Sequence, residues 1–245
     1  LYFASDEPEQ QQTEEIPDYP VTYFYTEQGY FKKITPQSLR MSGEQKVKEG
    51  DRVVQETPGS NADHLLFFTD HCQVYKSRGA DFDDTKASAL GDYIPSKLSF
   101  EKDETPLYMA ATNHYSRYMV FVFENGKIAK VEMSAYATKT NRKKLLSAFS
   151  DKAPLARALY LKEDCELLLT SSNGRRLAVH TAVIAAKTTK NTQGVSVMTQ
   201  RKGHRVTGVE IAPPEHPFIG RYRTRSLPAA GKLPAQEEAG EQLTL

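Results

Sequence analysis

Lysine and arginine are concentrated in the second half of this 245-residue sequence. Residues 171–225 contain ten of them and only two acidic residues, and residues 112–152 also lean basic. A surface of one sign attracts polyanions over about 8–10 Å in physiological salt, so a phosphate backbone is the natural ligand. The alternative interpretation is an ordinary solvated face. The candidate phosphate contacts, in order of preference, are Arg175, Arg176, Lys187, Lys190, Arg201, Lys202 and Arg205, then Lys127, Lys130, Arg142, Lys143 and Lys144.

Patterns for catalysis or metal binding are weak. The six histidines show no recognisable spacing from a nucleophile, and Cys72 and Cys165 lack a CxxC or Cys-x-x-His spacing. The acidic run at residues 81–84 is interpreted as a solvated loop, because carboxylates bind Mg²⁺ readily only when they converge. We therefore expect no catalytic residue, no metal and no cofactor in this chain. An enzyme would instead require a deep pocket with clustered, perturbed titratable groups.

The composition favours a folded, soluble chain. There are 32 Lys plus Arg against 31 Asp plus Glu, and 39% of the residues are apolar. The longest apolar run, residues 118–123, is far shorter than the roughly 18 residues of a membrane span. No signal peptide precedes Tyr19, so we expect a cytoplasmic protein without a membrane partner, and a start at Leu1 that lies within a longer protein. Residues 1–17 are acidic and are predicted to be a linker.

The organising feature is a repeat. Residues 23–33 (YFYTEQGYFKK), 66–76 (LFFTDHCQVYK) and 120–130 (VFVFENGKIAK) share β-formers, a turn and a second strand that ends in Lys, and residues 167–177 are a weaker copy. Their spacing of four to five dozen residues is typical of propeller blades. We predict four repeats at about 21–58, 64–111, 118–162 and 165–212. A β-sandwich with accidental similarity is the alternative fold.

Each repeat is predicted to begin with a hairpin, because β-branched and aromatic runs flank a tight turn. Gly29, Gly126 and Gly174 supply a positive φ, whereas Cys72 at the same position predicts another turn or some strain. The aromatic residues of these strands are expected in the core. Residues 43–54 and 194–209 are each read as strand, Gly turn and strand, and residues 142–150 are the best candidate for a short helix.

The repeats in register, the KEGDRVV segment at residues 48–54 and the KTTKNTQGVSVM segment at residues 187–198 resemble the C-terminal repeats of the A subunit of bacterial type IIA topoisomerases, DNA gyrase and topoisomerase IV. The resemblance covers roughly residues 17–213. It implies an all-β, propeller-like β-pinwheel of about four to six four-stranded blades, open or closed, with strands exchanged between neighbouring blades. It also implies sequence-nonspecific binding and bending of double-stranded DNA around a basic rim.

The same resemblance implies an accessory domain, inert alone, of an ATP-dependent topoisomerase. Its partners would be the ATPase subunit and the remainder of the A subunit, in a nucleoid-associated, cytoplasmic bacterial enzyme. Gyrase carries a QRRGGKG box, whereas residues 39–47 keep only a basic residue, one Gly and a Lys, beside the acidic Glu44. This departure favours a role like that of topoisomerase IV or of a divergent gyrase.

Charge also predicts where DNA would lie. We expect DNA on the blades built from residues 112–152 and 171–225, and away from the acidic one built from residues 64–108. Residues 214–245 are predicted to be a basic, then flexible tail. The competing functional class is a protein-interaction propeller that does not touch nucleic acid.

Overall fold

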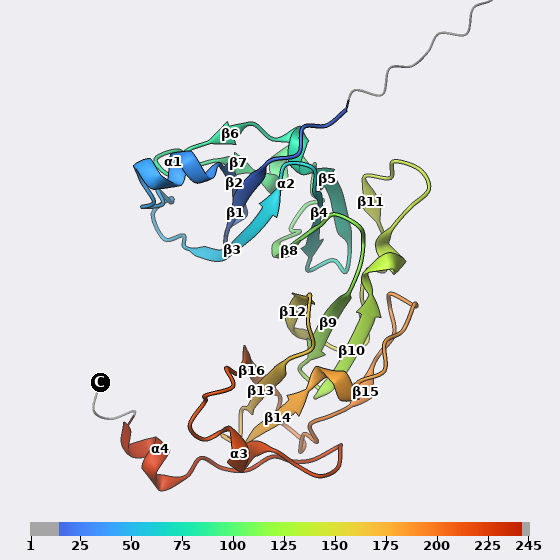
Figure 1. The fold of residues 1–245 in the computed structure, drawn as a ribbon. Helices are drawn as coiled ribbons and strands as arrows, with labels where there is room; N and C mark the ends of the chain where they lie inside the picture. Colours follow the sequence, from blue (N-terminus) through green and yellow to red (C-terminus); the bar gives the residue numbers. More distant parts are fainter. Residues whose placement is uncertain (1–14, 242–245) are drawn as a thin grey trace, which may run out of the picture.

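The computed structural model of the protein describes residues 15–241, which form four small β-sheets arranged in an open arc (Figure 1). We call these sheets blades 1 to 4 in chain order. The all-β, propeller-like fold with four blades is confirmed. The predicted linker at residues 1–17 lies almost entirely outside the described residues.

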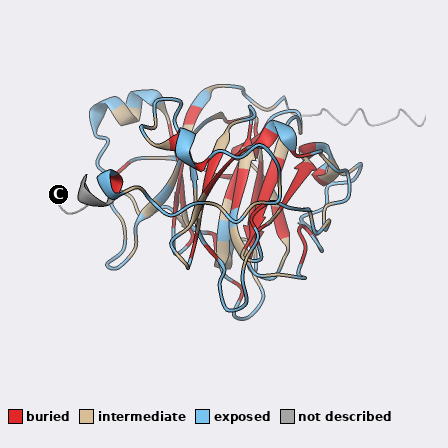
Figure 2. Ribbon diagram, turned by 90° about the horizontal axis from the view of Figure 1, so that it is seen from below, coloured by how far each residue is buried: buried red, intermediate tan, exposed pale blue. Residues whose placement is uncertain are grey.

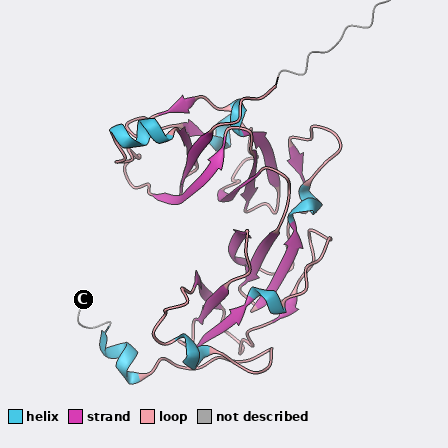
Figure 3. Cartoon of the chain, in the orientation of Figure 1, coloured by secondary structure: helices cyan, strands magenta, loops and turns pink. Residues whose placement is uncertain are grey.

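Each blade is built on one of the predicted hairpins. From the inside of the arc outwards, the main strands are β3 (Val53–Ser60), β1 (Pro20–Thr26) and β2 (Tyr30–Ile34) in blade 1, β8 (Pro106–Thr112), β4 (His64–Thr69) and β5 (Val74–Arg78) in blade 2, β12 (Leu155–Leu161), β9 (Tyr118–Phe123) and β10 (Lys127–Glu132) in blade 3, and β16 (Val206–Ile211), β13 (Glu166–Ser171) and β14 (Arg176–His180) in blade 4. Strands and connecting loops dominate the chain, with only short helices (Figure 3).

The outer strand of blades 1 to 3 is donated by the repeat that follows. These strands are β6 (Asp84–Thr85) and β7 (Asp92–Tyr93) on β2, β11 (Lys144–Leu145) on β5, and β15 (Val195–Ser196) on β10. Each arrives through what we call a crossover segment, which begins with a 3-10 turn after the hairpin. The three crossover segments are residues 79–93, 133–145 and 181–196. The exchange of strands implied by the sequence resemblance is present.

The tail completes blade 4, which has no following repeat. Arg176 and Lys232 exchange two backbone hydrogen bonds, of 2.8 and 2.9 Å, at the outer edge of this blade. The short helix α3 (Ile219–Tyr222) covers the outer face of the blade with Ile219 and Tyr222, which pack on Leu168 and Ala178. A last helix, α4, spans Gln236–Glu241. The prediction of a flexible tail is therefore wrong for the described residues, because residues 219–232 take the place that an exchanged strand has elsewhere.

The core lies between blades. Tyr23, Tyr25 and Phe67 are buried between blades 1 and 2, Phe68 and Phe121 are buried between blades 2 and 3, and leucines and valines fill the space between blades 3 and 4. In Figure 2 the buried residues follow the strands, while the loops and short helices are exposed. The prediction that the repeated aromatic residues are core residues is confirmed.

Local predictions fared unevenly. All four hairpin turns have a positive φ, which is 103°, 83° and 84° at the glycines and 54° at Cys72, so Cys72 adopts the backbone conformation that disfavours non-glycine residues. Residues 142–150 contain β11 instead of a helix, because Lys144 and Leu145 pair with β5. Residues 43–49 form no strand, although β15, a turn at Gly203 and β16 match the prediction for residues 194–209. Two further short helices are α1 (Pro36–Met41) and α2 (Ile94–Lys97).

Candidate nucleic-acid interface

The crossover segments place charge at the outer edges of the blades. Segment 79–93 carries four aspartates and one lysine, segment 133–145 carries three lysines and one arginine, and segment 181–196 carries two lysines; the last two segments contain no acidic residue. Topologically equivalent segments therefore change from acidic on blade 1 to basic on blades 2 and 3. An anionic duplex that follows the outer edge would be repelled at one end of the arc and attracted along the rest.

The basic side chains of segment 133–145 are exposed on a fixed backbone. The backbone N–H of Lys76 donates to the carbonyl of Lys143 at 2.8 Å, and Leu145 is buried beside Val74. Arg142, Lys143 and Lys144 are exposed. Lys144 pairs with Glu101 at 3.2 Å, whereas no carboxylate of the described residues lies within ion-pair distance of Arg142 or Lys143. These two cations are available to an external anion.

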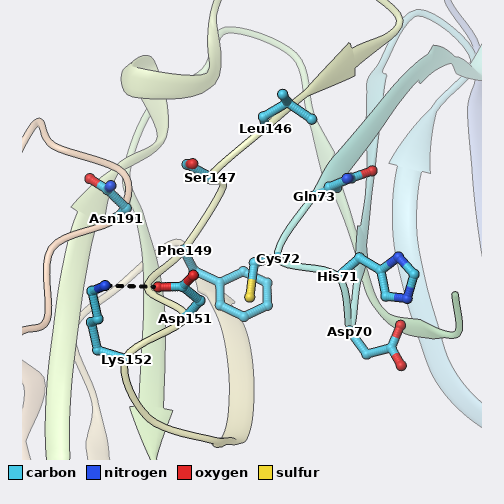
Figure 4. A pocket seen from close by; sticks show the side chains of 10 residues that line it. All are labelled: Asp70, His71, Cys72, Gln73, Leu146, Ser147, Phe149, Asp151, Lys152 and Asn191. Atoms are coloured by element: carbon cyan, nitrogen blue, oxygen red, sulfur yellow. Dashed lines mark ion pairs between the residues drawn. The ribbon is translucent and has the colours of Figure 1, made fainter.

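Segment 181–196 is held in a similar way. The backbone of Lys187 donates to Lys130 O at 2.8 Å and accepts from the Glu132 N–H at 2.9 Å, which leaves its side chain exposed. Lys190 is half-buried. Its neighbour Asn191 lines a hollow of about 630 Å³ with Cys72 and Lys152 (Figure 4), so the outer edges of blades 2 and 3 adjoin here. Lys152 pairs with Asp151 at 3.8 Å in this hollow.

Blade 4 exposes a third basic group. Arg201 and Lys202 are exposed in the turn that precedes β16. Arg205 is also exposed but pairs with Glu124 at 3.0 Å. Arg175 is half-buried and donates to Gly231 O at 3.0 Å, so part of its donor capacity is used within the chain. Lys127, at the start of β10, is also half-buried.

Two of the twelve predicted contacts have internal roles. Lys130 is only 6% exposed, and its ammonium group binds Asp164 Oδ1 at 2.9 Å and Thr181 O at 3.2 Å. An ammonium group buried in this way cannot reach an external phosphate, so the prediction for Lys130 is wrong. Arg176 binds Glu238 at 2.7 Å and Glu210 at 3.6 Å, so its charge is already compensated. The other ten residues stay predictions.

Strand exchange changes the assignment of charge to blades. The blade expected to repel DNA, built on residues 64–108, receives the basic strand β11 at its outer edge. Its own acidic segment is carried to blade 1. The charge count along the chain was correct, but its translation into blades was wrong by one position, because each crossover segment lies on the preceding blade.

The acidic side chains on blade 1 are partly structural. Asp84 accepts hydrogen bonds from Tyr19 and pairs with the Lys33 ammonium at 3.2 Å, and Asp81 accepts the Arg78 N–H at 2.8 Å. Burial and, to a lesser extent, Asp84 raise the pKa of Tyr19 to about 12. Asp83 is exposed and has no ion-pair partner among the described residues. It contributes negative charge to the outer edge without a visible structural partner.

Other reactive groups are occupied by hydrogen bonds. His71, Glu101 and Glu104 each bring a ligand atom within 4.8 Å of one another, but Glu104 accepts from the hydroxyl groups of Thr69 and Tyr75. Hydrogen bonds from His71, Lys144 and Gln73 lower the pKa of Glu101 to about 2. Burial raises the pKa of the Cys72 thiol, which disfavours the thiolate that a nucleophilic cysteine needs.

Comparisons with known proteins agree with this architecture. No family model matches the sequence. The chain is 22% identical over 212 residues, about four-fifths of its length, to the DNA gyrase A protein of Staphylococcus epidermidis, of which it covers 23%. It is 26% identical over 133 residues to the DNA gyrase A protein of Mycobacterium tuberculosis, covering 54% of this chain and 16% of that one. The chain thus spans less than a quarter of the length of these relatives.

Solved structures share the fold at low identity. The C-terminal domain of DNA topoisomerase IV superposes with a TM-score of 0.68 at 21% identity, over 81% of this chain and 63% of that one. The C-terminal domain of E. coli ParC gives a TM-score of 0.66 at 13% identity, over 89% and 94% of the two chains. The C-terminal domain of DNA gyrase A gives 0.56 at 15% identity, over 90% and 80%.

Proposed function

Because the chain is homologous to DNA gyrase A proteins and has the fold of the C-terminal domains of type IIA topoisomerases, we propose that it binds and bends duplex DNA without sequence preference along the outer edges of blades 2 to 4. The observation that carries this proposal is the basic character of crossover segments 133–145 and 181–196 at equivalent outer edges. Their side chains end in ammonium and guanidinium groups, which bind phosphates and do not read bases.

The energetics suit a salt-sensitive interaction. Each neutralised phosphate releases condensed counterions and contributes about −0.9 to the slope of log K against log [salt]. Bending a 20–30 bp site by several tens of degrees costs of the order of 1–6 kcal/mol, which further phosphate contacts along a curved edge must offset. The arc supplies such an edge, because its blades follow one another along a curve (Figure 1).

Within a larger enzyme this chain would be the part that handles DNA. The strand-cleaving tyrosine, the metal site and the ATPase would lie elsewhere, in the ATPase subunit or in the remainder of the A subunit of a cytoplasmic, nucleoid-associated assembly. The chain itself would use no cofactor. Among residues 15–241, no helix is long and apolar enough to cross a membrane.

A titration tests this function. A fluorescently labelled 40-bp duplex of arbitrary sequence is titrated with the 245-residue chain at 50 and 200 mM salt, and again with a second, unrelated sequence. We expect micromolar or tighter binding at low salt, equal affinity for the two sequences and a loss of at least tenfold at high salt. Absence of binding at 50 mM salt would refute the proposal and favour the protein-interaction class, for which the acidic outer edge of blade 1 offers a surface to a cationic partner.

A further inference from the structure

Three lysines occupy the same place in successive repeats. Lys33, Lys76 and Lys130 each follow the hairpin turn by four residues, on the strand that receives the exchanged segment. Lys33 is 3% exposed, Lys130 is 6% exposed and Lys76 is half-buried. Burying an ammonium group is costly unless it is paired and hydrogen-bonded, so their repetition calls for a common partner.

The common partner is the 3-10 turn of the following repeat. The three turns span Gly79–Asp81, Met133–Tyr136 and Thr181–Val183. Lys33 Nζ donates to Gly79 O at 3.0 Å, Lys76 Nζ to Tyr136 O at 2.9 Å, and Lys130 Nζ to Thr181 O at 3.2 Å. In every case the accepting carbonyl belongs to the turn that begins the crossover segment.

Secondary contacts reinforce each lysine in its own way. Lys33 also donates to Asn61 at 2.6 Å, Lys76 to Thr138 Oγ1 at 3.1 Å and Lys130 to Asp164 at 2.9 Å. The ammonium groups lie 5.9, 4.9 and 4.4 Å from the ring centres of Tyr19, Tyr115 and Tyr118, respectively. A tyrosine ring stabilises a desolvated cation at these distances.

Blade 4 provides the contrast. The residue four positions after its turn is Ala178, which is 4% exposed and packs in the apolar cluster with Ile219 and Tyr222. No repeat follows this blade, so no crossover turn needs to be held there. The lysine is present in the three blades that receive a segment from a following repeat, and it is replaced by a small apolar residue where the tail covers the blade.

We propose that Lys33, Lys76 and Lys130 are inter-blade latches that fix each crossover segment, and with it the angle between neighbouring blades. The turn held by Lys76 leads directly into the basic residues of segment 133–145, and the turn held by Lys130 leads into segment 181–196. For DNA, and resting on the proposed function, the latches position the cations of the outer edge and set its curvature without touching phosphate themselves.

Amide hydrogen exchange tests the latch without DNA. The variant Lys130→Met is compared with Lys143→Gln, which removes an exposed cation, in the full 245-residue chain. We expect exchange across residues 181–196 to rise roughly tenfold or more in Lys130→Met, as when a hydrogen bond to a charged group is lost, while β9 and β10 stay protected. Lys143→Gln should leave exchange there unchanged. Unchanged exchange at residues 181–196 in a folded Lys130→Met would overturn the proposal.

DNA binding gives a second readout on the same two variants. Lys130→Met should keep the salt slope of the wild type but bend a duplex less, measured by energy transfer between dyes at its two ends. Lys143→Gln should reduce the slope by about 0.9. A slope reduced by Lys130→Met as much as by Lys143→Gln would show that Lys130 contacts phosphate and would overturn its role as a latch.

The design separates the possible failures. If the wild type binds no DNA, the proposed function fails while hydrogen exchange still decides on the latch. If Lys130→Met does not fold, the half-buried Lys76 takes its place: Lys76→Met should raise exchange across residues 133–145, and unchanged exchange there would refute the latch.

Discussion

Blades 1 and 2 show how one architecture carries opposite charge. Each has an outer edge of two-residue strand pairing supplied by the following repeat, parallel through β6 in blade 1 and antiparallel through β11 in blade 2. Each crossover segment begins at a 3-10 turn whose carbonyl receives a lysine from the blade. Yet segment 79–93 carries four aspartates, whereas segment 133–145 carries four cations and no acid.

This difference separates what the fold needs from what function needs. The backbone hydrogen bonds, the turn and the latch place the segment, and they are made by groups that both blades share. The charged side chains mostly point to solvent, where a change of sign costs the fold little. The charge of an outer edge can therefore vary independently of its position, and the basic run on blade 2 is best explained by a ligand.

Removing the basic run should have the largest effect. The variant Arg142→Gln/Lys143→Gln/Lys144→Gln deletes three candidate phosphate contacts and should flatten the salt slope by about 2.7, which at 0.1 M salt is a loss of several hundred-fold in affinity. Isothermal titration or fluorescence anisotropy with a 40-bp duplex measures both quantities. An affinity within threefold of the wild type would place the DNA elsewhere on the molecule.

The repeat shows how far the sequence alone could predict this arrangement. Turn chemistry and runs of β-formers act over about ten residues, so the four hairpins and their positive φ values were predictable. The strands β6, β11 and β15 were not, since two residues have no periodicity and pair with partners some fifty or more positions away. Lys130 illustrates the limit for the site: its partner Asp164 is 34 positions distant, so charge alone could not show that it is buried.

Blade 2 should also be the more sensitive to acid. Burial, with Arg78 and Lys76 nearby, lowers the pKa of His64 to about 4, whereas an unfolded chain has its histidine pKa near 6.5. Between pH 6.5 and pH 4 the unfolded chain binds a proton that the folded chain does not, so stability should fall by about 2–3 kcal/mol over that range.

The variant His64→Gln isolates this effect, since glutamine cannot be protonated but keeps a polar side chain beside Tyr115. Urea unfolding at pH 7.0, 5.5 and 4.0 should show a smaller loss of stability in the variant than in the wild type. Parallel pH curves for the two proteins would mean that His64 does not titrate as its surroundings suggest.

Extending the basic edge onto blade 1 should have a smaller effect of opposite sign. Asp83 is exposed and free of ion pairs within the described structure, so Asp83→Lys should fold normally. On a duplex long enough to reach blade 1 it should steepen the salt slope by about 0.9 and raise the affinity roughly eightfold at 0.1 M salt. A short duplex that spans only blades 2 and 3 should bind with unchanged affinity, and equal gains on both duplexes would indicate a general charge effect.

The smallest effect distinguishes structural from electrostatic acids on blade 1. Asp84 is 42% exposed at its side chain and pairs with Lys33, which is buried, so Asp84→Asn should cost about 1 kcal/mol of stability by leaving the latch with only its neutral acceptors. Asp83→Asn is the matched control and should change stability by less than about 0.5 kcal/mol, as expected for an exposed residue without partners. Both variants remove one negative charge from the same edge, so they should improve binding of a long duplex equally. Equal stability of the two variants in urea unfolding would mean that Asp84 contributes only to the charge of the edge, and that the latch of blade 1 relies on Asn61 and the Gly79 carbonyl alone.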